Sequence, residues 1–256
     1  DSSTSRGLGD VYKRQHQYLF LHKSFEFPKA DKVSLALLKF FTVLTSLGAK
    51  ERLALSFRYM KDDPQNNIRV IPPLLRKEVT LHEPYSGDYI HGYMVNAGFS
   101  ENVMKWHRQH PRIPLRFFWD KWEEEPVKRV DNTLSFYQLD DVEFLRQMAG
   151  CKAYASTAGF ESVCEAMYLG KPILMVPAHI EQDCNAYDAK KSGAGIISSD
   201  FNLQQLLEFA KDYHPNRDFV YWVRGAEYTL LNLLESDSSN YQQVLFNEMY
   251  LVEEFI

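Results

Sequence analysis

Residues 157–177 read TAGFESVCEAMYLGKPILMVP and continue into AHIEQDCNAYDAKKSGAG. A turn of small residues, a short amphipathic helix, a Gly-Lys-Pro break and an apolar run follow one another in this stretch. The run PILMV, residues 172–176, is apolar at every position rather than at every second one. That pattern is typical of a strand buried on both faces of a parallel sheet. The stretch therefore predicts a strand–turn–helix–strand unit of an α/β fold.

The rest of the chain extends this pattern. Between residues 88 and 213, short apolar runs alternate with amphipathic segments, and the charged stretch DKWEEEPVKRVDN (120–132) is expected to be a loop. Strands that alternate with helices predict a doubly wound parallel sheet. Pro72 and Pro73 cannot donate to a sheet ladder, so we place a domain junction between about Pro72 and Tyr85.

The part before the junction is shorter. HQYLFLH (16–22), ERLALSF (51–57) and IRVIPP (68–73) are expected to be strands. The segment 33–49 is apolar nearly all round, so we expect a helix buried in a core, with a helix lying on a membrane surface as the alternative. The first fifteen residues resemble translated adapter sequence and are set aside.

Composition excludes several classes of protein. A net charge of −5 and a pI near 5.9 argue against a nucleic-acid binder. The three cysteines show no metal-ligand spacing and leave an odd thiol, which favours a reducing cytoplasm. No uncharged apolar run reaches the ~18 residues of a membrane span, and no signal peptide is visible.

The turn at 156–159 lies where a strand passes into a helix. Its residues are small, so backbone amides can approach an anion, and the helix N-terminus adds unpaired N–H groups and partial positive charge. Thr157 and Ser162 add hydroxyl groups, and the set suits a diphosphate. The alternative is structural: Ser162 and Glu165 have the spacing of a capping box, in which nothing is bound.

Other polar groups are weaker candidates. On its residues alone, the turn 96–100, which precedes a helix, is expected to be an ordinary helix cap. His107 and His110 lack a third metal ligand. The pairs Asp62-Asp63 and Asp140-Asp141 are expected to serve as a turn and a helix cap.

Read as a whole, 157–186 resembles the donor-binding segment of GT-B glycosyltransferases. Those families share the pattern H/S-G-G-x-N/T-S-x-x-E-A, then G-x-P, P, D/E-Q and N-A. The matching residues here are Thr157-Ala158-Gly159, Ser162, Glu165-Ala166, Gly170-Lys171-Pro172, Pro177, Glu181-Gln182 and Asn185-Ala186. The likeness is to plant and animal UDP-sugar transferases and, over residues 16–213, to a MurG-like bacterial group.

The resemblance implies a role for each matched position. The turn and Ser162 would hold the donor diphosphate, Glu165 the ribose, and Glu181 and Gln182 the donor sugar, with Asn185 as support. Further contacts to donor or acceptor are implied at Gly98, Gln138, Leu139, His179 and His16. Two positions depart from the pattern. Thr157 stands where plant enzymes carry His, and Glu161 stands where many carry Asn.

The resemblance implies a glycosyltransferase that moves a sugar from a nucleotide-diphosphate donor, UDP-linked, to a hydroxyl on a lipid-linked or saccharide acceptor. The implied parts are the rest of an acceptor domain (16–80), a donor domain (86–219) and a helical segment packing back across the junction (220–256). No cofactor or metal is implied, and the expected location is cytoplasmic, including the inner face of the membrane. A sugar-nucleotide 2-epimerase and a non-catalytic sugar-nucleotide-binding module remain alternatives.

No catalytic base can be assigned from the residues. The resemblance places a Gly-rich, His-containing loop on the first strand of the acceptor domain, and no such stretch occurs here. We therefore expect about the first third of the natural two-domain protein to lie upstream. The present chain is expected to retain donor binding.

Overall fold

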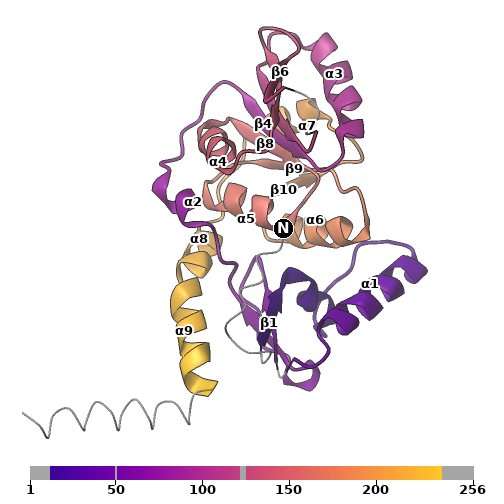
Figure 1. Ribbon diagram of the computed structural model, residues 1–256, viewed down its shortest axis with the longest axis vertical. Coiled ribbons are helices and arrows are strands. Elements are labelled where there is room, and N and C mark those ends of the chain that lie inside the picture. The colour runs from indigo at the N-terminus through magenta and orange to yellow at the C-terminus, as the bar shows by residue number, and fades with distance from the viewer. Residues whose placement is uncertain (1–11, 50, 122–124, 238–256) are drawn as a thin grey trace, which may run out of the picture.

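The computed structural model describes residues 12–49, 51–121 and 125–237. Two sheets lie one above the other, a small one near the N-terminus and a larger one formed by the middle of the chain (Figure 1). No helix among the described residues has both the length and the hydropathy needed to cross a bilayer.

The larger sheet has the strand order β10-β9-β8-β4-β5-β7-β6. All pairs are parallel except β6 with β7. Without β6, the chain order of the remaining strands is that of a doubly wound nucleotide-binding sheet, and it reverses between β4 and β8. The strands are β4 (Ile90–Met94), β5 (Leu115–Trp119), β6 (Val127–Arg129), β7 (Leu134–Gln138), β8 (Ala153–Ser156), β9 (Ile173–Met175) and β10 (Gly195–Ile197). The predicted fold class is therefore confirmed.

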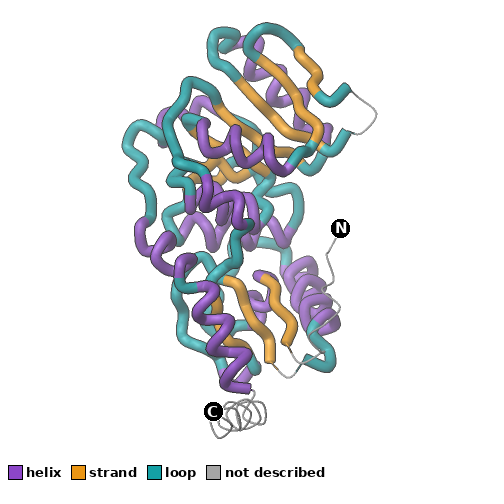
Figure 2. Tube along the Cα trace, turned by 60° about the vertical axis from the view of Figure 1, so that its left-hand side comes forward, coloured by secondary structure: helices purple, strands orange, loops and turns teal. Residues whose placement is uncertain are grey.

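Helices cover both faces of this sheet (Figure 2). One face carries α3 (Ser100–Gln109), which follows the short 3-10 helix η3 (Ala97–Phe99), and α7 (Leu203–Phe209). The other face carries α4 (Asp141–Gly150), α5 (Phe160–Tyr168) and α6 (Ile180–Lys191). β8 and β9 are buried at every position, as the all-apolar pattern predicts.

One strand of this sheet was not expected. β6 lies inside the segment predicted to be a charged loop, and it pairs with β7 at the edge of the sheet. Lys128 and Arg129 are exposed, so the strand has no apolar alternation from which it could be recognised. Charged residues on an edge strand also discourage pairing with other chains.

The small sheet contains β1 (Tyr12–Gln15), β2 (Glu51–Leu55) and β3 (Ile68–Ile71), all parallel. β1 lies in the segment set aside as adapter-like. The predicted strand 16–22 is wrong, because 16–21 forms the 3-10 helix η1 (His16–Leu21). Tyr18, Leu19 and Phe20 are buried in succession, and a short apolar run of this kind does not distinguish a strand from a tight helix.

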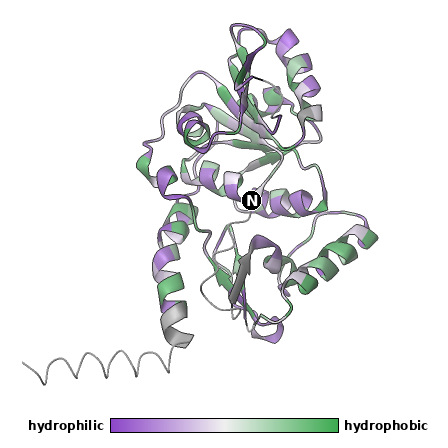
Figure 3. Ribbon diagram, viewed as in Figure 1, coloured by the Kyte–Doolittle hydropathy of each residue, from purple (hydrophilic) through white to green (hydrophobic). Residues whose placement is uncertain are grey.

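Helix α1 (Lys32–Thr45) follows η1, and its predicted burial is wrong. Within this helix only Leu38 and Thr42 are buried. The helix contacts η1 and α6, and the opposite side is exposed, with apolar residues along it (Figure 3). A helix that is apolar all round can bury only the side that meets a neighbour.

Between β3 and β4 the chain forms the short helix α2 (Lys77–Leu81), which lies in the segment 72–85 predicted to be a domain junction. At the other end of the chain, α8 (Arg217–Arg224) ends at Gly225, and α9 (Ala226–Asp237) follows it. Helix α8 packs on α5, whereas α9 packs on β3 of the small sheet. The indole N–H of Trp222 donates to the carbonyl of Ser56 at 2.9 Å, which ties the C-terminal helices to the N-terminal part.

Candidate functional site

A cleft of about 540 Å³ lies between the two sheets. The N-terminal part lines it with His16, Gln17, Leu55 and Leu74, and the larger sheet lines it with Tyr93, Gly159, Phe160, Glu161, Ser162 and Glu181. The turn after β8 forms one wall, beside the point where the strand order reverses. Ligands of doubly wound sheets bind in this position, outside the carboxyl ends of the strands.

The turn between β8 and α5 has an unusual backbone. Ala158 is fully buried and has a φ of 63°, a left-handed conformation that costs an L-residue roughly 1–2 kcal/mol. Its amide donates to Ser156 Oγ at 3.1 Å, and the Asn185 amide group donates to its carbonyl at 3.5 Å. Asn185 thus contacts the turn from behind, and the strained turn directs the chain into α5.

The N-terminus of α5 is open to the cleft. Its N-cap, Gly159, makes no side-chain cap hydrogen bond, and the first intrahelical bond runs from the Val163 amide to the Gly159 carbonyl. The amides of Phe160, Glu161 and Ser162 therefore have no acceptor within the helix. Thr157, in the turn before the helix, is fully buried and does not itself line the cleft, and its Oγ1 has no partner among the described residues. The first-turn amides of α5 are suited to an anion.

The capping-box alternative is wrong. Helix α5 begins at Phe160, so Ser162 is its third residue and donates its hydroxyl to the Gly159 carbonyl at 3.2 Å. Glu165 is the sixth residue, one turn beyond the third position that the Glu of a capping box occupies. Neither side chain caps the helix, so the first-turn amides remain available.

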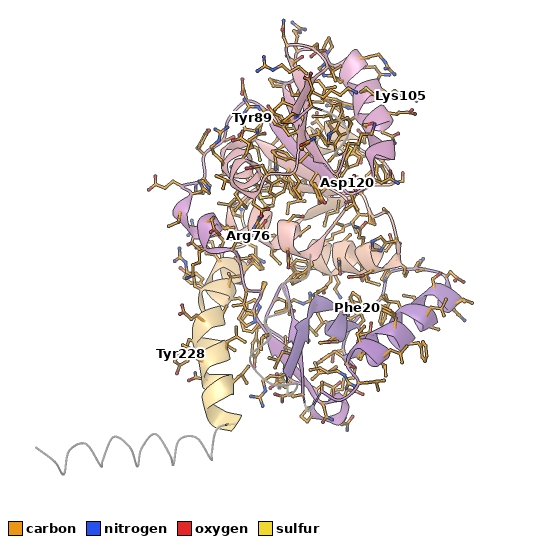
Figure 4. All side chains as sticks on the ribbon, viewed as in Figure 1. Phe20, Arg76, Tyr89, Lys105, Asp120 and Tyr228 are labelled. Carbon is orange, nitrogen blue, oxygen red and sulfur yellow. The ribbon has the colours of Figure 1, made fainter. Side chains whose placement is uncertain are left out.

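Glu165 is buried, and both of its carboxylate oxygens are held by Arg76. Arg76, the N-cap of α2, is labelled in Figure 4. The Nε–Oε1 distance is 2.6 Å and the Nη2–Oε2 distance is 2.8 Å, while Nη1 reaches Asp141 Oδ1 at 2.8 Å. Burial raises the pKa of Glu165, and the hydrogen-bonded guanidinium of Arg76 opposes that rise. Arg76 therefore joins the junction to α4 and α5 at the position implied for the ribose.

Sequence reasoning missed Arg76. It lies 89 residues before Glu165 and belongs to no local motif. Its position between the two predicted domains could have identified it, because an arginine in a short segment that joins two sheets lies close to a ligand bound between them.

Of the two residues implied for the donor sugar, Glu181 lines the cleft and Gln182 does not. Glu181 lines the cleft together with Gly159 and Ser162. Gln182 is buried, and its Oε1 accepts a hydrogen bond from the Ala178 amide at 2.9 Å. His179 is the N-cap of α6, is exposed, and is not among the residues that line the cleft.

His16 lies on the opposite wall. Its Nδ1 is 2.7 Å from the Leu55 carbonyl, and its ring stacks on Phe160 with centroids 4.0 Å apart and an interplanar angle of 15°. Burial lowers the pKa of His16 to about 4, so the ring is neutral at pH 7 and Nδ1 carries the donated proton. Nε2 then holds a lone pair and has no partner within the described residues.

The remaining implied contacts do not line this cleft. Gly98 lies after β4, and its amide donates to Asn96 Oδ1 at 2.8 Å. The amide of Gln138, at the end of β7, donates to the Pro126 carbonyl at 2.9 Å, and Leu139 is exposed. Glu161, which departs from the family pattern, is exposed and faces the cleft.

The weaker candidates make contacts within the protein, and the expected solvated helix end is wrong for His107, which is buried. His107 binds Asp131 at 2.8 Å, whereas the ring of His110 stacks on Trp106. Asp140 accepts from the Glu143 amide and caps α4. Asp62 and Asp63 accept backbone amides of Val70 and Lys23. Among the described residues no group of three or more His, Cys, Asp or Glu side chains is placed to hold a metal ion.

Comparison with known proteins agrees with this geometry. The family model described as glycosyl transferase family 1 matches residues 24–213. The glycosyltransferase of kitacinnamycin superposes with a TM-score of 0.52 at 14% identity, covering 80% of this chain and 63% of its own. The calicheamicin glycosyltransferase CalG4 gives 0.52 at 12% identity, covering 81% of this chain and 61% of its own. No curated protein matches the sequence.

The present chain thus spans less than two thirds of the solved structures it resembles. At these identities the likeness shows a shared fold, the GT-B fold. The narrower MurG-like group is not established by these matches. The match of the family model over most of the chain shows that this protein belongs to glycosyl transferase family 1.

Proposed function

We propose that this chain binds a nucleotide-diphosphate sugar, UDP-linked, and forms the donor-binding part of an enzyme that transfers the sugar to an acceptor hydroxyl. The observation that carries the proposal is the open N-terminus of α5. Its first-turn amides have no acceptor within the helix and lie at the reversal point of a doubly wound sheet, and in the turn before them the buried Thr157 Oγ1 has no partner among the described residues.

Other groups around the cleft fit the remaining parts of a donor. Glu165, oriented by Arg76, would accept hydrogen bonds from the ribose hydroxyls. Glu181 would read hydroxyls of the sugar, while Gln182 has only its amide N–H groups left for a ligand because its carbonyl oxygen is engaged. The ends of β4 and β7, near Gly98 and Gln138, would border the base.

The proposed reaction is a displacement at the anomeric carbon. The acceptor oxygen forms a bond to that carbon while the bond to the diphosphate oxygen breaks, and the acceptor proton passes to a base. The α5 amides and helix dipole would stabilise the charge that develops on the leaving diphosphate. His16 faces this region from the N-terminal wall and would contact the acceptor side. The family match favours transfer over 2-epimerisation or binding without catalysis.

The acceptor and the location belong to the same proposal. A hydroxyl of a lipid-linked or saccharide acceptor would enter between the two sheets. All three cysteines are free and buried, which supports a reducing, cytoplasmic setting.

The test is a calorimetric titration of the folded chain with UDP. Thr157→Val keeps the shape of the side chain and removes the hydroxyl, so we expect UDP affinity to fall roughly three- to tenfold. Thr42→Val is the matched control, because Thr42 is also buried but donates to the Leu38 carbonyl in α1. A folded chain that binds no UDP at millimolar concentration would rule out the proposal.

A further inference from the structure

Arg76 contacts two helices of the larger sheet at once. Its Nε and Nη2 atoms donate to the two carboxylate oxygens of Glu165 on α5, while Nη1 donates to Asp141 Oδ1 on α4 at 2.8 Å. The guanidinium carbon also lies 6.0 Å from the ring centroid of Phe144, within the range of a cation–π contact. The arginine therefore has two partners, Asp141 and Phe144, that do not depend on Glu165.

The segment that carries Arg76 is fixed to the same part of the molecule. Arg76 is the N-cap of α2, and Val79 in that helix is fully buried in the core cluster that contains Phe144 and Val163. Helix α2 also contacts α4. Because the backbone is held in this way, the guanidinium leaves Glu165 through rotation of its own side chain.

Glu165 is not accessible to a ligand while Arg76 is in this position. The Glu165 side chain is 3% exposed, and neither residue is among those that line the cleft. A carboxylate oxygen has lone pairs for two donors, so chemistry alone allows a ribose and Arg76 to share it. Sharing also needs open space beside the oxygens, and this burial leaves none. A ribose hydroxyl therefore reaches Glu165 only after the guanidinium has moved away.

Glu165 is nevertheless close to the proposed diphosphate site. Ser162, which lines the cleft, lies three residues before Glu165 on the same side of α5. One helical turn spans about 5.4 Å, a length that a single nucleotide covers. The same ligand can therefore contact the first turn of α5 and Glu165.

We propose that Arg76 is an intramolecular competitor of the donor ribose: the two ribose hydroxyls exchange with its guanidinium on Glu165, and the guanidinium stays on Asp141. The exchange conserves hydrogen bonds, because two O–H donors replace two N–H donors on the same two oxygens. A buried carboxylate without donors is costly, so a nucleotide that lacks these hydroxyls leaves Arg76 in place. Arg76 has this role only if Glu165 binds the ribose, as the proposed function states.

The exchange lowers the apparent affinity for UDP. Part of the free energy of ribose binding goes into releasing Arg76, so the measured affinity is weaker than that of the uncovered site. A residue that only orients Glu165 would have the opposite effect, since its loss would weaken the ribose contact. The two roles therefore predict changes of opposite sign.

Arg76→Lys separates these roles. Lysine keeps the positive charge but replaces the two-pronged contact by a single ammonium group, so it competes less well for Glu165. We expect UDP affinity in calorimetry to rise roughly three- to tenfold. Affinity for dideoxy-UDP, which lacks both ribose hydroxyls, should stay unchanged.

Arg146→Lys is the matched control. Arg146 binds Glu143 through the same two atoms, Nε and Nη2, but it does so on the surface of α4 and away from the cleft. The substitution should leave both affinities unchanged. Thermal unfolding checks that each variant is folded.

NMR of the arginine side chains gives a second readout that needs no variant. The Nε–H signal of Arg76 should shift when the unmodified chain is saturated with UDP, because the hydrogen bond to Glu165 is lost. The same signal should stay in place on saturation with dideoxy-UDP, which leaves that hydrogen bond intact.

Three results would overturn this role of Arg76 and leave the proposed function standing. They are UDP affinity in Arg76→Lys that is equal to or weaker than in the unmodified chain, an equal gain for dideoxy-UDP, and an Arg76 signal that UDP does not move. An equal gain would mean that Arg76 obstructs the cleft rather than competing with the hydroxyls. If the folded, unmodified chain binds neither ligand, the proposed function fails, and the role of Arg76 fails with it.

Discussion

Arg76 and Glu165 form a two-pronged ion pair between the junction and α5, with distances of 2.6 and 2.8 Å. The carboxylate is almost fully buried, whereas the guanidinium is about one third exposed. Arg76 therefore covers Glu165 on its solvent side. A ribose that binds Glu165 has either to share its oxygens with Arg76 or to displace the guanidinium.

Arg76→Met should destabilise the chain in a pH-dependent way. Because burial raises the pKa of Glu165, its carboxyl group keeps a proton to higher pH in the folded chain than in the unfolded chain. The free energy of unfolding therefore falls as the pH rises from the unfolded pKa to the folded one. Losing Arg76 raises the folded pKa further and widens the interval upward from 4.5. We expect a loss of about 1–2 kcal/mol at pH 7 and a much smaller loss below pH 4.5, measured by urea unfolding.

The control for this prediction is Arg146→Met. Arg146 pairs with Glu143 on the surface of α4, so its removal should change stability by less than about 0.5 kcal/mol. A loss in Arg76→Met that is the same at pH 4 and pH 7 would contradict the proposed link to Glu165.

Ala158→Gly tests the strained turn. Glycine adopts a positive φ without penalty, so the substitution recovers backbone strain that offsets the lost methyl group and the added freedom of the unfolded chain. Ala155→Gly, in β8, removes an equally buried methyl group from an ordinary backbone position. We expect Ala158→Gly to be the more stable of the two by about 1–2 kcal/mol in chemical unfolding. Equal losses would show that the turn stores no strain.

His16 should remain neutral well below its ordinary titration range. Its pKa is lowered from 6.5 to about 4 by burial, so between these values the unfolded chain binds a proton that the folded chain does not. Stability is therefore lost as the pH falls from 6.5 to 4. His16→Gln should lack this part of the pH dependence in urea unfolding, whereas His214→Gln, at an exposed site, should keep it. Histidine NMR that shows His16 titrating near pH 6.5 would contradict the prediction.

Local pattern was enough for the scaffold. The all-apolar run of β9 and the small turn between β8 and α5 indicated a doubly wound sheet, whereas the anion site at Thr157–Gly159 stays a prediction. Contacts between distant segments decided the rest. Arg76 reaches Glu165 across 89 residues, and the exposure of α1 depends on which neighbours meet it, so neither follows from periodicity.

Glu161→Gln should change stability and UDP affinity in opposite directions. Glu161 is the second residue of α5 and faces the cleft, so its negative charge favours the helix N-terminus but repels a diphosphate bound there. We expect the variant to lose about 0.3–1 kcal/mol of stability. We also expect it to bind UDP about threefold more tightly at low salt, with a smaller gain at high salt.

The matched control is Asp218→Asn in the first turn of α8, which has the same relation to its helix but does not line the cleft. It should lose similar stability and leave UDP affinity unchanged by calorimetry. If Glu161→Gln weakens UDP binding, the carboxylate is a ligand of the nucleotide sugar. Its departure from the family pattern would then be part of donor recognition in this protein.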